Sequence, residues 1–212
     1  MRQHYFHPSD PKAKEQMIDE GIVLALEKVD QSVEDRATHS YLRGRALDAA
    51  QQYSAEAEES LSRAVKLAPE AVEAWNALGH VFWKKKDLAA ARDCFLSANG
   101  VVENSESLRS LSMLLRHMAP TKKNESVDAA KKAASLGLSD AEAWYALGNA
   151  LVARYFDDSG RSAADLRDAV KAYARAEKLY DGLDRRPLQY GNPDLYFNRA
   201  HLRKYLQDDA AA

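Results

Sequence analysis

The residues of this sequence that could carry chemistry are those of a binding surface, and they recur at a fixed helical spacing. Side chains that are mostly polar or aromatic stand one, five and eight residues after the bulky residue that opens each of several amphipathic segments, and side chains at these positions lie off the packed face of a helix. They are Asn76, His80 and Trp83, then Arg109, Met113 and Arg116, then Tyr145, Asn149 and Val152, and last Phe197, His201 and Lys204, with Asp194 and Asn198 nearby. Such a mixture suits a short extended peptide, because amides can hold its backbone while charged groups bind its side chains. The pattern predicts a peptide-binding groove, and Asp194 favours a ligand with both signs of charge.

Motifs of catalysis and of metal or cofactor binding are absent from the sequence. It has no Gly-rich phosphate loop, no pair of cysteines and no His-Glu-x-x-His motif, and its 6 histidines are scattered. We therefore expect no enzyme, no cofactor and no metal site. The cationic runs 84–86 and 122–123 are interpreted as solvated charge, and the lone Cys94 as a buried apolar side chain rather than a reactive thiol.

The stretch 70–98 indicates which elements must position these residues. Trp75, Leu78, Gly79 and Phe82 fall on one helical face at offsets 0, 3, 4 and 7, and Ala91, Phe95 and Ala98 follow at offsets 16, 20 and 23. This is the tetratricopeptide pattern, in which a helix–turn–helix unit of about 34 residues is repeated. We expect Gly79 and Ala91 where the two antiparallel helices of the unit touch, and Trp75 and Phe95 in the wedge to the next unit.

The pattern predicts an all-α fold, a right-handed superhelical tetratricopeptide-repeat solenoid of about four and a half helix pairs with an N-terminal capping helix. The apolar side of the capping helix is formed by Met17, Ile18, Ile22, Leu24, Leu26 and Val29. We expect a tail and the capping helix over 1–35, repeat 1 over 36–69, repeat 2 over 70–103, repeat 3 with an expanded turn over 104–138, repeat 4 with an inserted loop over 139–182, and the first helix of a truncated repeat 5 over 183–212. The return helix of repeat 3 is expected to begin at Val127, and an irregular loop is expected over 181–193.

Composition and charge agree with a helical domain and exclude several classes of function. Of the 212 residues, 46% are hydrophobic and 29% are charged, with 30 Lys and Arg against 32 Asp and Glu. Charges so balanced create no overall field that would favour nucleic acid or an anionic membrane, so we predict neither direct DNA binding nor a membrane partner. One cysteine allows no disulfide within the chain, and the first residues lack the apolar core of a signal peptide. We therefore expect a cytosolic protein, with the nucleus as a second compartment.

Two of the groove candidates have a structural alternative that the sequence leaves open. Arg116 could pair with a neighbouring carboxylate, and Asp194, which follows an Asn-Pro pair, could cap the helix that begins there; we weigh this cap evenly against ligand binding. The chaperone-binding subset of this fold clamps a terminal carboxylate with Lys, Asn and Arg on successive first helices. The matching positions here do not form that clamp; they are Tyr41, Asn76, Arg109 and Tyr145.

Several strings of this sequence resemble one family in order and in spacing, over roughly residues 40–205. They are LSRAVKLAPEAVEAWNALGHVFWKKKDLAAARDCF, SLRSLSMLLRHM, AWYALGNALVARYF, AYARAEK and NPDLYFNRAHLRKY. The string SLSMLLR, the ARYF extension and NPDLYFNRA are not part of the general repeat consensus. The resemblance is therefore specific to the family of tetratricopeptide repeat protein 5, also called Strap.

The resemblance implies a particular ligand. Members of that family recognise the first residues of nascent tubulins, Met-Arg-Glu and onward, at the ribosome, and they trigger tubulin mRNA decay through an adaptor to the mRNA-decay machinery. The arginine of the SMLLR string and the aspartate of the NPD string are groove residues in the family, and they fall here on Arg116 and Asp194. By charge, Arg116 would pair with the peptide glutamate and Asp194 with the peptide arginine. Asn76, Asn149 and Asn198 would hold the peptide backbone.

Two other hypotheses stay open. The family is also described as a nuclear stress-response cofactor that scaffolds acetyltransferase and actin-nucleating partners, and the sequence does not separate that role from the first. Relatives are expected to continue into an oligonucleotide/oligosaccharide-binding-type β domain, which this sequence lacks together with a further acidic groove residue. The other hypothesis is a structural fragment without a groove ligand, in which exposed apolar residues of the last helix would cause dimerisation or aggregation. Those residues are Leu195, Phe197 and Leu202.

Overall fold

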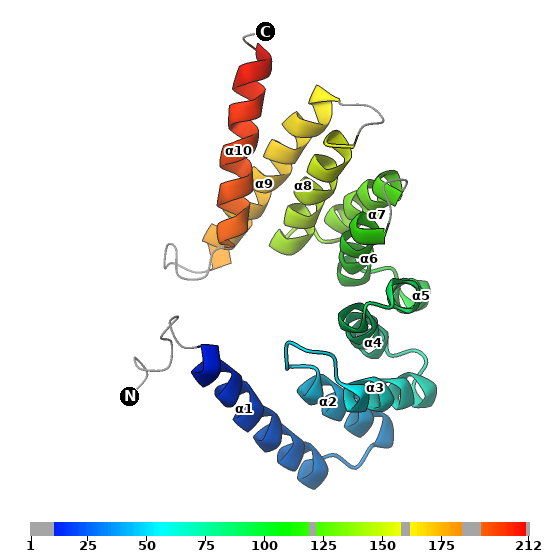
Figure 1. Cartoon of the computed structure of the whole chain (residues 1–212). Helices are drawn as coiled ribbons and strands as arrows, with labels where there is room; N and C mark the ends of the chain where they lie inside the picture. The colour runs from blue at the N-terminus through cyan, green and yellow to red at the C-terminus, as the bar shows by residue number, and fades with distance from the viewer. Residues whose placement is uncertain (1–10, 119–121, 158–161, 184–191, 211–212) are drawn as a thin grey trace. The chain divides into compact units, whose positions relative to one another are not determined.

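Helices make up the fold wherever the chain can be described. The structure, a computed structural model, describes residues 11–118, 122–157, 162–183 and 192–210, and within these ranges it contains no strand. The helices are α1 (Pro11–Ser32), α2 (Arg36–Leu47), α3 (Ala55–Leu67), α4 (Val72–Lys85), α5 (Leu88–Val101), α6 (Ser105–Met118), α7 (Lys123–Leu136), α8 (Ala141–Tyr155), α9 (Ala163–Leu183) and α10 (Pro193–Ala210), as Figure 1 shows. The all-α class is confirmed, while the predicted tail over 1–10 lies outside the described residues.

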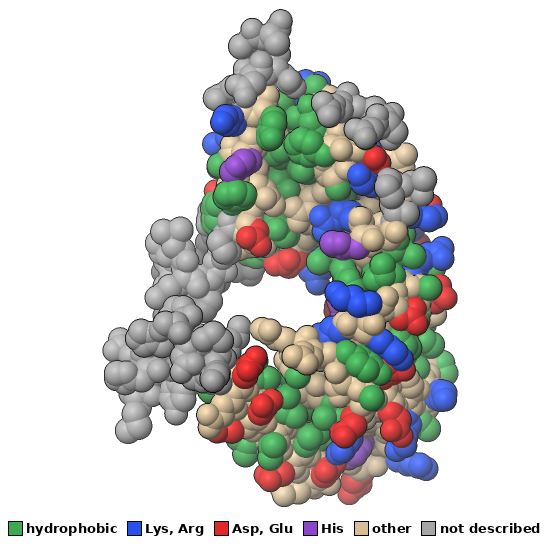
Figure 2. All heavy atoms as spheres, in the orientation of Figure 1, with side chains coloured by type: hydrophobic (Ala, Val, Ile, Leu, Met, Phe, Trp, Pro, Cys, Tyr) green, Lys and Arg blue, Asp and Glu red, His purple; other side chains and the backbone are tan. Residues whose placement is uncertain are grey.

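The helices belong to two compact units, of which the first ends at Val101 and the second begins at Val102. In the first unit, α2 packs against α3 and α4 against α5, while α1 lies on α2 and α3 on α4. In the second unit, α6 packs against α7 and α8 against α9, α8 also contacts α6 and α7, and α10 lies on α9. Each unit is thus built from helix pairs, as the periodicity predicts. Acidic and basic side chains are interspersed on the face of each unit that Figure 2 shows.

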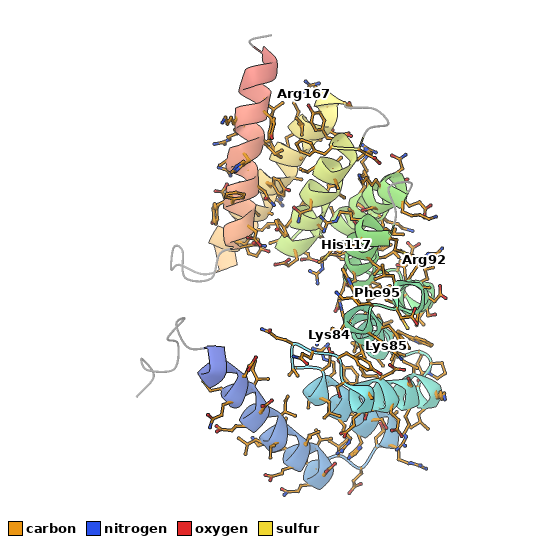
Figure 3. All side chains as sticks on the ribbon, in the orientation of Figure 1. Lys84, Lys85, Arg92, Phe95, His117 and Arg167 are labelled. Carbon is orange, nitrogen blue, oxygen red and sulfur yellow. The ribbon has the colours of Figure 1, made fainter. Side chains whose placement is uncertain are left out.

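A glycine on the first helix of a pair leaves room for a large side chain on the second helix. An added Cβ at Gly79 would lie 2.7 Å from the ring of Phe95, and one at Gly148 would lie 2.3 Å from the ring of Tyr173. Both rings are fully buried, and Figure 3 shows Phe95 between α4 and α5. The expectation for Phe95 is therefore corrected: this ring fills the interior of its own pair, because the missing Cβ of Gly79 leaves a hollow there.

The other two helix pairs show how far this arrangement varies. Gly44 faces the buried Leu61, whose Cγ would lie 2.5 Å from an added Cβ. In the third pair Ser112 takes the glycine position, and its hydroxyl lies 3.1 Å from the hydroxyl of Ser126. Ser126 also donates a hydrogen bond to the Ser112 carbonyl at 2.9 Å, and both side chains are fully buried. In this pair two small serines meet in place of a glycine and a large side chain, and hydrogen bonds satisfy their buried hydroxyl groups.

The lysines at the end of α4 are structural. Lys84 Nζ binds the Asp48 carboxylate at 2.7 Å and the carbonyl oxygens of Asp48 and Ala50, so it closes the C-terminal end of α2. Lys85 binds the carboxylate of Glu58 on α3 at 2.8 Å. Both lysines lie beside the turn between α2 and α3 (Figure 3). The interpretation of this run as solvated charge is corrected for these two side chains, because their ammonium groups hold neighbouring helix pairs of the first unit together.

Two helix ends differ from the sequence-based expectation. The helix α7 begins at Lys123 rather than at Val127, and α9 extends through Leu183 into the expected irregular loop. Where a helix ends depends on whether its last backbone groups bind capping residues or solvent, and the hydrophobic periodicity of the sequence carries no information on this. The remainder of the expected loop, residues 184–191, lies outside the described residues.

On α1, only part of the expected apolar side covers the neighbouring helix. Val29 is buried and Ile22 is half-buried, whereas Met17 and Leu24 are 41% and 60% exposed. At about 100° per residue, Met17 and Leu24 stand more than a quarter-turn around the helix from the face that Val29 and Ile22 share. The capping helix α1 therefore covers α2 with a narrower strip of apolar side chains than expected.

Cys94 of α5 is a buried free cysteine, as expected. Burial raises the pKa of its thiol to about 12, so the nucleophilic thiolate is scarce at neutral pH.

Candidate functional site

Arg116 lies in the last turn of α6 and brings an unpaired positive charge into the second unit. Its side chain is half-buried, its Nε atom is buried without a hydrogen-bond partner, and in the described part of the chain no carboxylate forms an ion pair with it. Burial lowers the pKa of the guanidinium, while the phenol groups of Tyr173 and Tyr145 act in the opposite direction. The alternative in which Arg116 pairs with a neighbouring carboxylate is thus not observed among these residues.

Replacement of Arg116 by methionine is expected to stabilise the free chain by roughly 1 kcal/mol, because the folded state no longer has to desolvate an unpaired guanidinium. Methionine has a similar length and fills the same space without a charge. Urea unfolding followed by far-UV circular dichroism measures the change. The control is Arg167→Met, which removes an exposed arginine of α9 and should leave stability unchanged. A destabilised Arg116→Met chain would contradict the prediction and indicate a structural role for the charge.

Two asparagines and a tyrosine form a hydrogen-bonded network in the same unit. Tyr173 Oη on α9 donates to Asn149 Oδ1 on α8 at 2.7 Å, and Asn198 Nδ2 on α10 donates to the same oxygen at 3.3 Å. The ring of Tyr145 on α8 lies 5.9 Å from the ring of Tyr173, centroid to centroid. Because α6 contacts α8 and both phenols act to raise the pKa of Arg116, α6, α8, α9 and α10 bring a cation, amides and aromatic surface together. We call these five residues the Arg116 site.

Asp194 lies in the first turn of α10, one helical turn before Asn198 and on the same helix face. The cap of this helix is Asn192, whose Oδ1 accepts a hydrogen bond from the Asp194 backbone N–H at 3.1 Å. The alternative in which Asp194 is the N-cap is therefore wrong. The Asp194 carboxylate is exposed, and among the described residues it has no hydrogen-bond or ion-pair partner.

The other candidates of the second unit lie around this site with different contacts. Arg109 forms an ion pair with Asp140 at 3.4 Å, and Asp140 also caps α8, so this arginine already has a structural partner. Met113 is half-buried on α6. Phe197 and His201 are exposed on α10, and their rings contact each other with centroids 4.1 Å apart. Val152 is half-buried, and Lys204 is exposed.

Asn76 and His80 belong to the first unit. Asn76 is only 2% exposed, so its amide lies in the interior and not on a groove surface as expected. The reason is that α4 is covered by both α3 and α5, which leaves a narrower exposed strip than a helix in one pair would have. His80 is half-buried, stacks on Trp83 with ring centroids 6.4 Å apart, and meets the edge of Phe95 at 5.1 Å.

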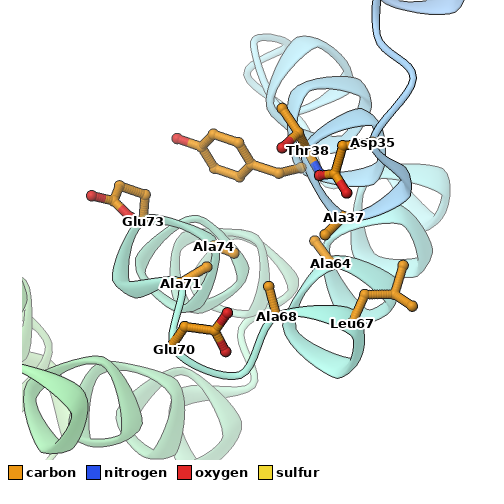
Figure 4. A pocket seen from close by; sticks show the side chains of 11 residues that line it. Asp35, Ala37, Thr38, Ala64, Leu67, Ala68, Glu70, Ala71, Glu73 and Ala74 are labelled. Carbon is orange, nitrogen blue, oxygen red and sulfur yellow. The ribbon is translucent and has the colours of Figure 1, made fainter.

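A pocket of about 500 Å³ also opens in the first unit, between α2, α3 and α4. Its lining combines small alanine side chains with the carboxylates of Asp35, Glu70 and Glu73 (Figure 4). Asp35 is already used as the cap of α2, because its side chain accepts a hydrogen bond from the Thr38 N–H at 2.7 Å. The acidic lining by itself identifies no ligand.

The apolar side of α10 is mostly covered. Leu195 and Leu202 are 0% and 3% exposed and belong to the core of the second unit, so the expected exposed patch is reduced to Phe197, which is 63% exposed. Leucines seven residues apart share one helix face, and α10 turns that face to α9. Figure 2 shows hydrophobic side chains gathered between α8 and α10. Phe156, at the C-terminal end of α8, and Tyr205 of α10 join these helices through rings whose centroids lie 5.5 Å apart.

Tyr173 belongs to the site, although the repeat pattern places it only among the packing residues. The sequence does contain a signal for it. A tyrosine stands where the second repeat has Phe95, and a buried tyrosine hydroxyl usually needs a hydrogen-bond partner. Which residue supplies that partner depends on three helices, and the sequence does not indicate it.

Over the described ranges, no group of three or more His, Cys, Asp and Glu side chains could hold a metal ion. No helix within the same ranges is long and apolar enough to cross a membrane.

Comparison with known sequences finds relatives that are about twice as long as this chain. No protein-family model matches the chain. Human tetratricopeptide repeat protein 5 is 44% identical over an alignment of 187 residues, which covers 85% of this chain and 41% of that protein. The Bos taurus protein of the same name is 41% identical over an alignment of 220 residues including gaps, which covers 98% of this chain and 48% of that protein. The chain thus spans about half the length of the curated relatives it matches.

Solved structures share the helical architecture. A chain of the APC/C hetero-tetramer Cut9–Hcn1 matches with a TM-score of 0.67 and 16% identity over 94% of this chain and 37% of that chain. MamA matches with a TM-score of 0.57 and 20% identity over 84% of this chain and 98% of its own. YrrB, described as a TPR protein with an unusual peptide-binding site, matches with a TM-score of 0.56 and 18% identity over 88% of this chain and 84% of its own. At these identities the likeness shows the fold alone, an all-α tetratricopeptide-repeat solenoid.

Proposed function

We propose, from the premise that this chain is a tetratricopeptide-repeat protein and a relative of tetratricopeptide repeat protein 5, that it is a peptide-binding adaptor for nascent tubulins. Its ligand is the N-terminal Met-Arg-Glu segment, bound at the ribosome. Binding triggers co-translational decay of the tubulin mRNA. Proteins of this repeat fold are generally scaffolds that bind through their concave surface and are not enzymes.

The observation that carries the proposal is a pair of opposite charges left without partners. Arg116 is half-buried with an unpartnered Nε, and the exposed Asp194 carboxylate stands one helical turn from Asn198, which belongs to the Arg116 site. A structural role would pair such charges within the chain, as it pairs Arg109 with Asp140. Both charges are therefore available to a ligand that carries an anion and a cation.

The segment Met-Arg-Glu carries one charge of each sign, and each charge can be assigned to one of these two residues. Arg116 pairs with the peptide glutamate, and Asp194 pairs with the peptide arginine. The pairing at Arg116 is the stronger of the two, because a half-buried guanidinium is screened less by water than an exposed carboxylate. YrrB, which shares the fold, is described as having a peptide-binding site, and this supports a peptide as the class of ligand.

The contacts with the ribosome and with the mRNA-decay machinery belong to the proposal for the whole protein, since this chain matches 41% and 48% of its relatives. The peptide site lies within the described residues and can be tested by itself.

The test is binding of a labelled peptide that begins Met-Arg-Glu, measured by fluorescence anisotropy. Arg116→Ala should weaken binding by roughly tenfold to a hundredfold, because a hydrogen bond to a charged group contributes about 1.5–3 kcal/mol. Asp194→Ala should weaken it by up to about fivefold, since an exposed ion pair contributes at most about 1 kcal/mol. A peptide with its Arg and Glu exchanged should bind the wild-type chain as weakly as the original peptide binds the chain that carries both Arg116→Ala and Asp194→Ala.

Matched controls separate the site from the general surface charge. Arg167→Ala and Asp168→Ala remove one exposed charge of each sign from α9 and should leave binding unchanged. A folded wild-type chain that does not bind the peptide, or that binds the exchanged peptide equally well, would refute the proposal. The second candidate role, a nuclear cofactor scaffold, would instead predict partner binding that survives the loss of both Arg116 and Asp194.

A further inference from the structure

We propose that Tyr173 is a positioning residue of the peptide site: its hydroxyl fixes the Asn149 side-chain amide so that the NH₂ group of Asn149 faces the ligand and donates to a peptide backbone carbonyl. This inference rests on the proposed function. It adds that the site offers hydrogen-bond donors, rather than acceptors, to the peptide backbone at Asn149. It also links the packing of the helix pair α8–α9 to recognition.

The acceptor side of the Asn149 amide is already occupied. Its Oδ1 accepts one hydrogen bond from Tyr173 Oη at 2.7 Å and a second from Asn198 Nδ2 at 3.3 Å. A carbonyl oxygen has two lone pairs and can accept both bonds, whereas a rotated amide would turn its NH₂ group toward the NH₂ group of Asn198 and lose that bond, and its bond with Tyr173 would have to reverse direction. The half-buried Asn149 has no hydrogen bond from Nδ2 to another described residue. The two N–H groups of this nitrogen are therefore left as donors for a ligand.

A donor amide suits the backbone of an extended peptide. Every residue of such a peptide presents a carbonyl oxygen, so contact with it gives affinity without a requirement for a particular side chain. Asn149 thus contributes general affinity, while the charges of Arg116 and Asp194 contribute the choice of sequence. An amide held in one orientation before binding also loses less conformational entropy when the peptide arrives.

The position of the Tyr173 hydroxyl is set by the core. Tyr173 is fully buried, and its ring occupies the hollow left by Gly148, where an added Cβ would lie 2.3 Å from Cε1. Gly148 is the residue directly before Asn149, so the ring and the amide it holds are positioned by the same turn of α8. Burial raises the pKa of the phenol well above its usual range, so the hydroxyl keeps its proton and remains a donor.

The other helix pairs indicate that the hydroxyl is not needed for packing. The hollow at Gly79 is filled by Phe95 and the hollow at Gly44 by Leu61, and neither side chain carries a polar group. The hydroxyl occurs in the pair whose glycine is followed by an asparagine. Its function is therefore to be sought in its contact with Asn149.

A double-mutant cycle on the whole chain tests the inference, with the labelled Met-Arg-Glu peptide as the probe. Tyr173→Phe keeps the ring in its hollow and removes only the hydroxyl, and it should weaken binding by about threefold to tenfold, the range expected for one hydrogen bond. Asn149→Ala should weaken binding at least as much. The double variant should bind no more weakly than Asn149→Ala, because Tyr173 acts through Asn149.

Tyr53→Phe is the control. The Tyr53 hydroxyl donates to the Glu58 carboxylate at 2.8 Å in the first unit, so the variant loses a tyrosine hydrogen bond away from the Arg116 site. It should leave peptide affinity unchanged. The unfolding midpoint of every variant is measured alongside, since a purely structural role would lower stability in both tyrosine variants alike without affecting affinity.

The outcomes distinguish this inference from the proposed function. Unchanged affinity in Tyr173→Phe, or additive losses in the double variant, would overturn the inference while leaving peptide binding through Arg116 intact. A wild-type chain that is folded and does not bind the peptide would overturn the proposed function and this inference together.

Discussion

Substitution of Gly148 by alanine is expected to destabilise the α8–α9 pair by about 2–3 kcal/mol, the cost of forcing extra volume into a packed core. The added Cβ would lie 2.3 Å from Cε1 and 2.5 Å from Cδ1 of Tyr173. The ring is fully buried and cannot turn aside without displacing its neighbours. Amide hydrogen exchange resolved along the chain measures the effect locally, and it should rise in α8 and α9 but not in α4 and α5.

Gly100→Ala provides the comparison for this prediction. Gly100 is also within a helix, α5, but no atom lies within 4 Å of its added Cβ. Alanine should therefore be neutral there or stabilise the helix by up to about 1 kcal/mol, since it is the better helix former. If Gly148→Ala behaved like Gly100→Ala, the hollow filled by Tyr173 would not be a constraint. If exchange rose equally in both units, the effect would not come from this helix pair.

Removal of the Asp165 carboxylate should destabilise the second unit by about 2–3 kcal/mol, because the substitution leaves a partly buried charge without its partner. Asp165 is 7% exposed, and its two oxygens accept hydrogen bonds from Arg154 Nε at 2.8 Å and Nη2 at 2.6 Å. These bonds raise the pKa of Arg154. They also join the end of α8 to the start of α9 across the insertion between them. Urea unfolding of Asp165→Ala measures the loss.

Asp168→Ala tests whether burial is the reason for that loss. Asp168 stands one turn further along α9 and forms an ion pair with Lys171 at 2.9 Å, with side chains 56% and 78% exposed. Its removal should cost no more than about 0.5 kcal/mol, as for other exposed pairs on helices. Equal losses in the two variants would mean that the buried geometry of the Arg154 pair adds nothing.

Much of the fold could be predicted because it depends on periodicity. The spacing of Trp75, Leu78 and Gly79 repeats at Trp144, Leu147 and Gly148, and a helix turns any such spacing into one packed face. The helix pairs therefore follow from the sequence, whereas the start of α7 and the end of α9 do not. Those ends depend on capping contacts and on solvent, which leave a weaker pattern.

The candidate site could be predicted only in part. Arg116 and Asp194 were identified by helical spacing and by the resemblance to one family, and the structure leaves both charges without a partner among the described residues. Asn76 satisfied the same spacing and is buried. Spacing along one helix states which side a residue faces, but it does not state how many neighbouring helices cover that side.

The sequence by itself thus determined the helix pairs, the register of glycines along them and the types of charge available for binding, because each is encoded within a single helical segment. Only the tertiary structure decided which side chains fill the hollows, that Lys84 closes the end of α2, and that Tyr173 holds Asn149. Each of these contacts joins one helix to another. Their partners are selected by the volume and the unpaired polar atoms that packing leaves, quantities that exist only once the helices have come together.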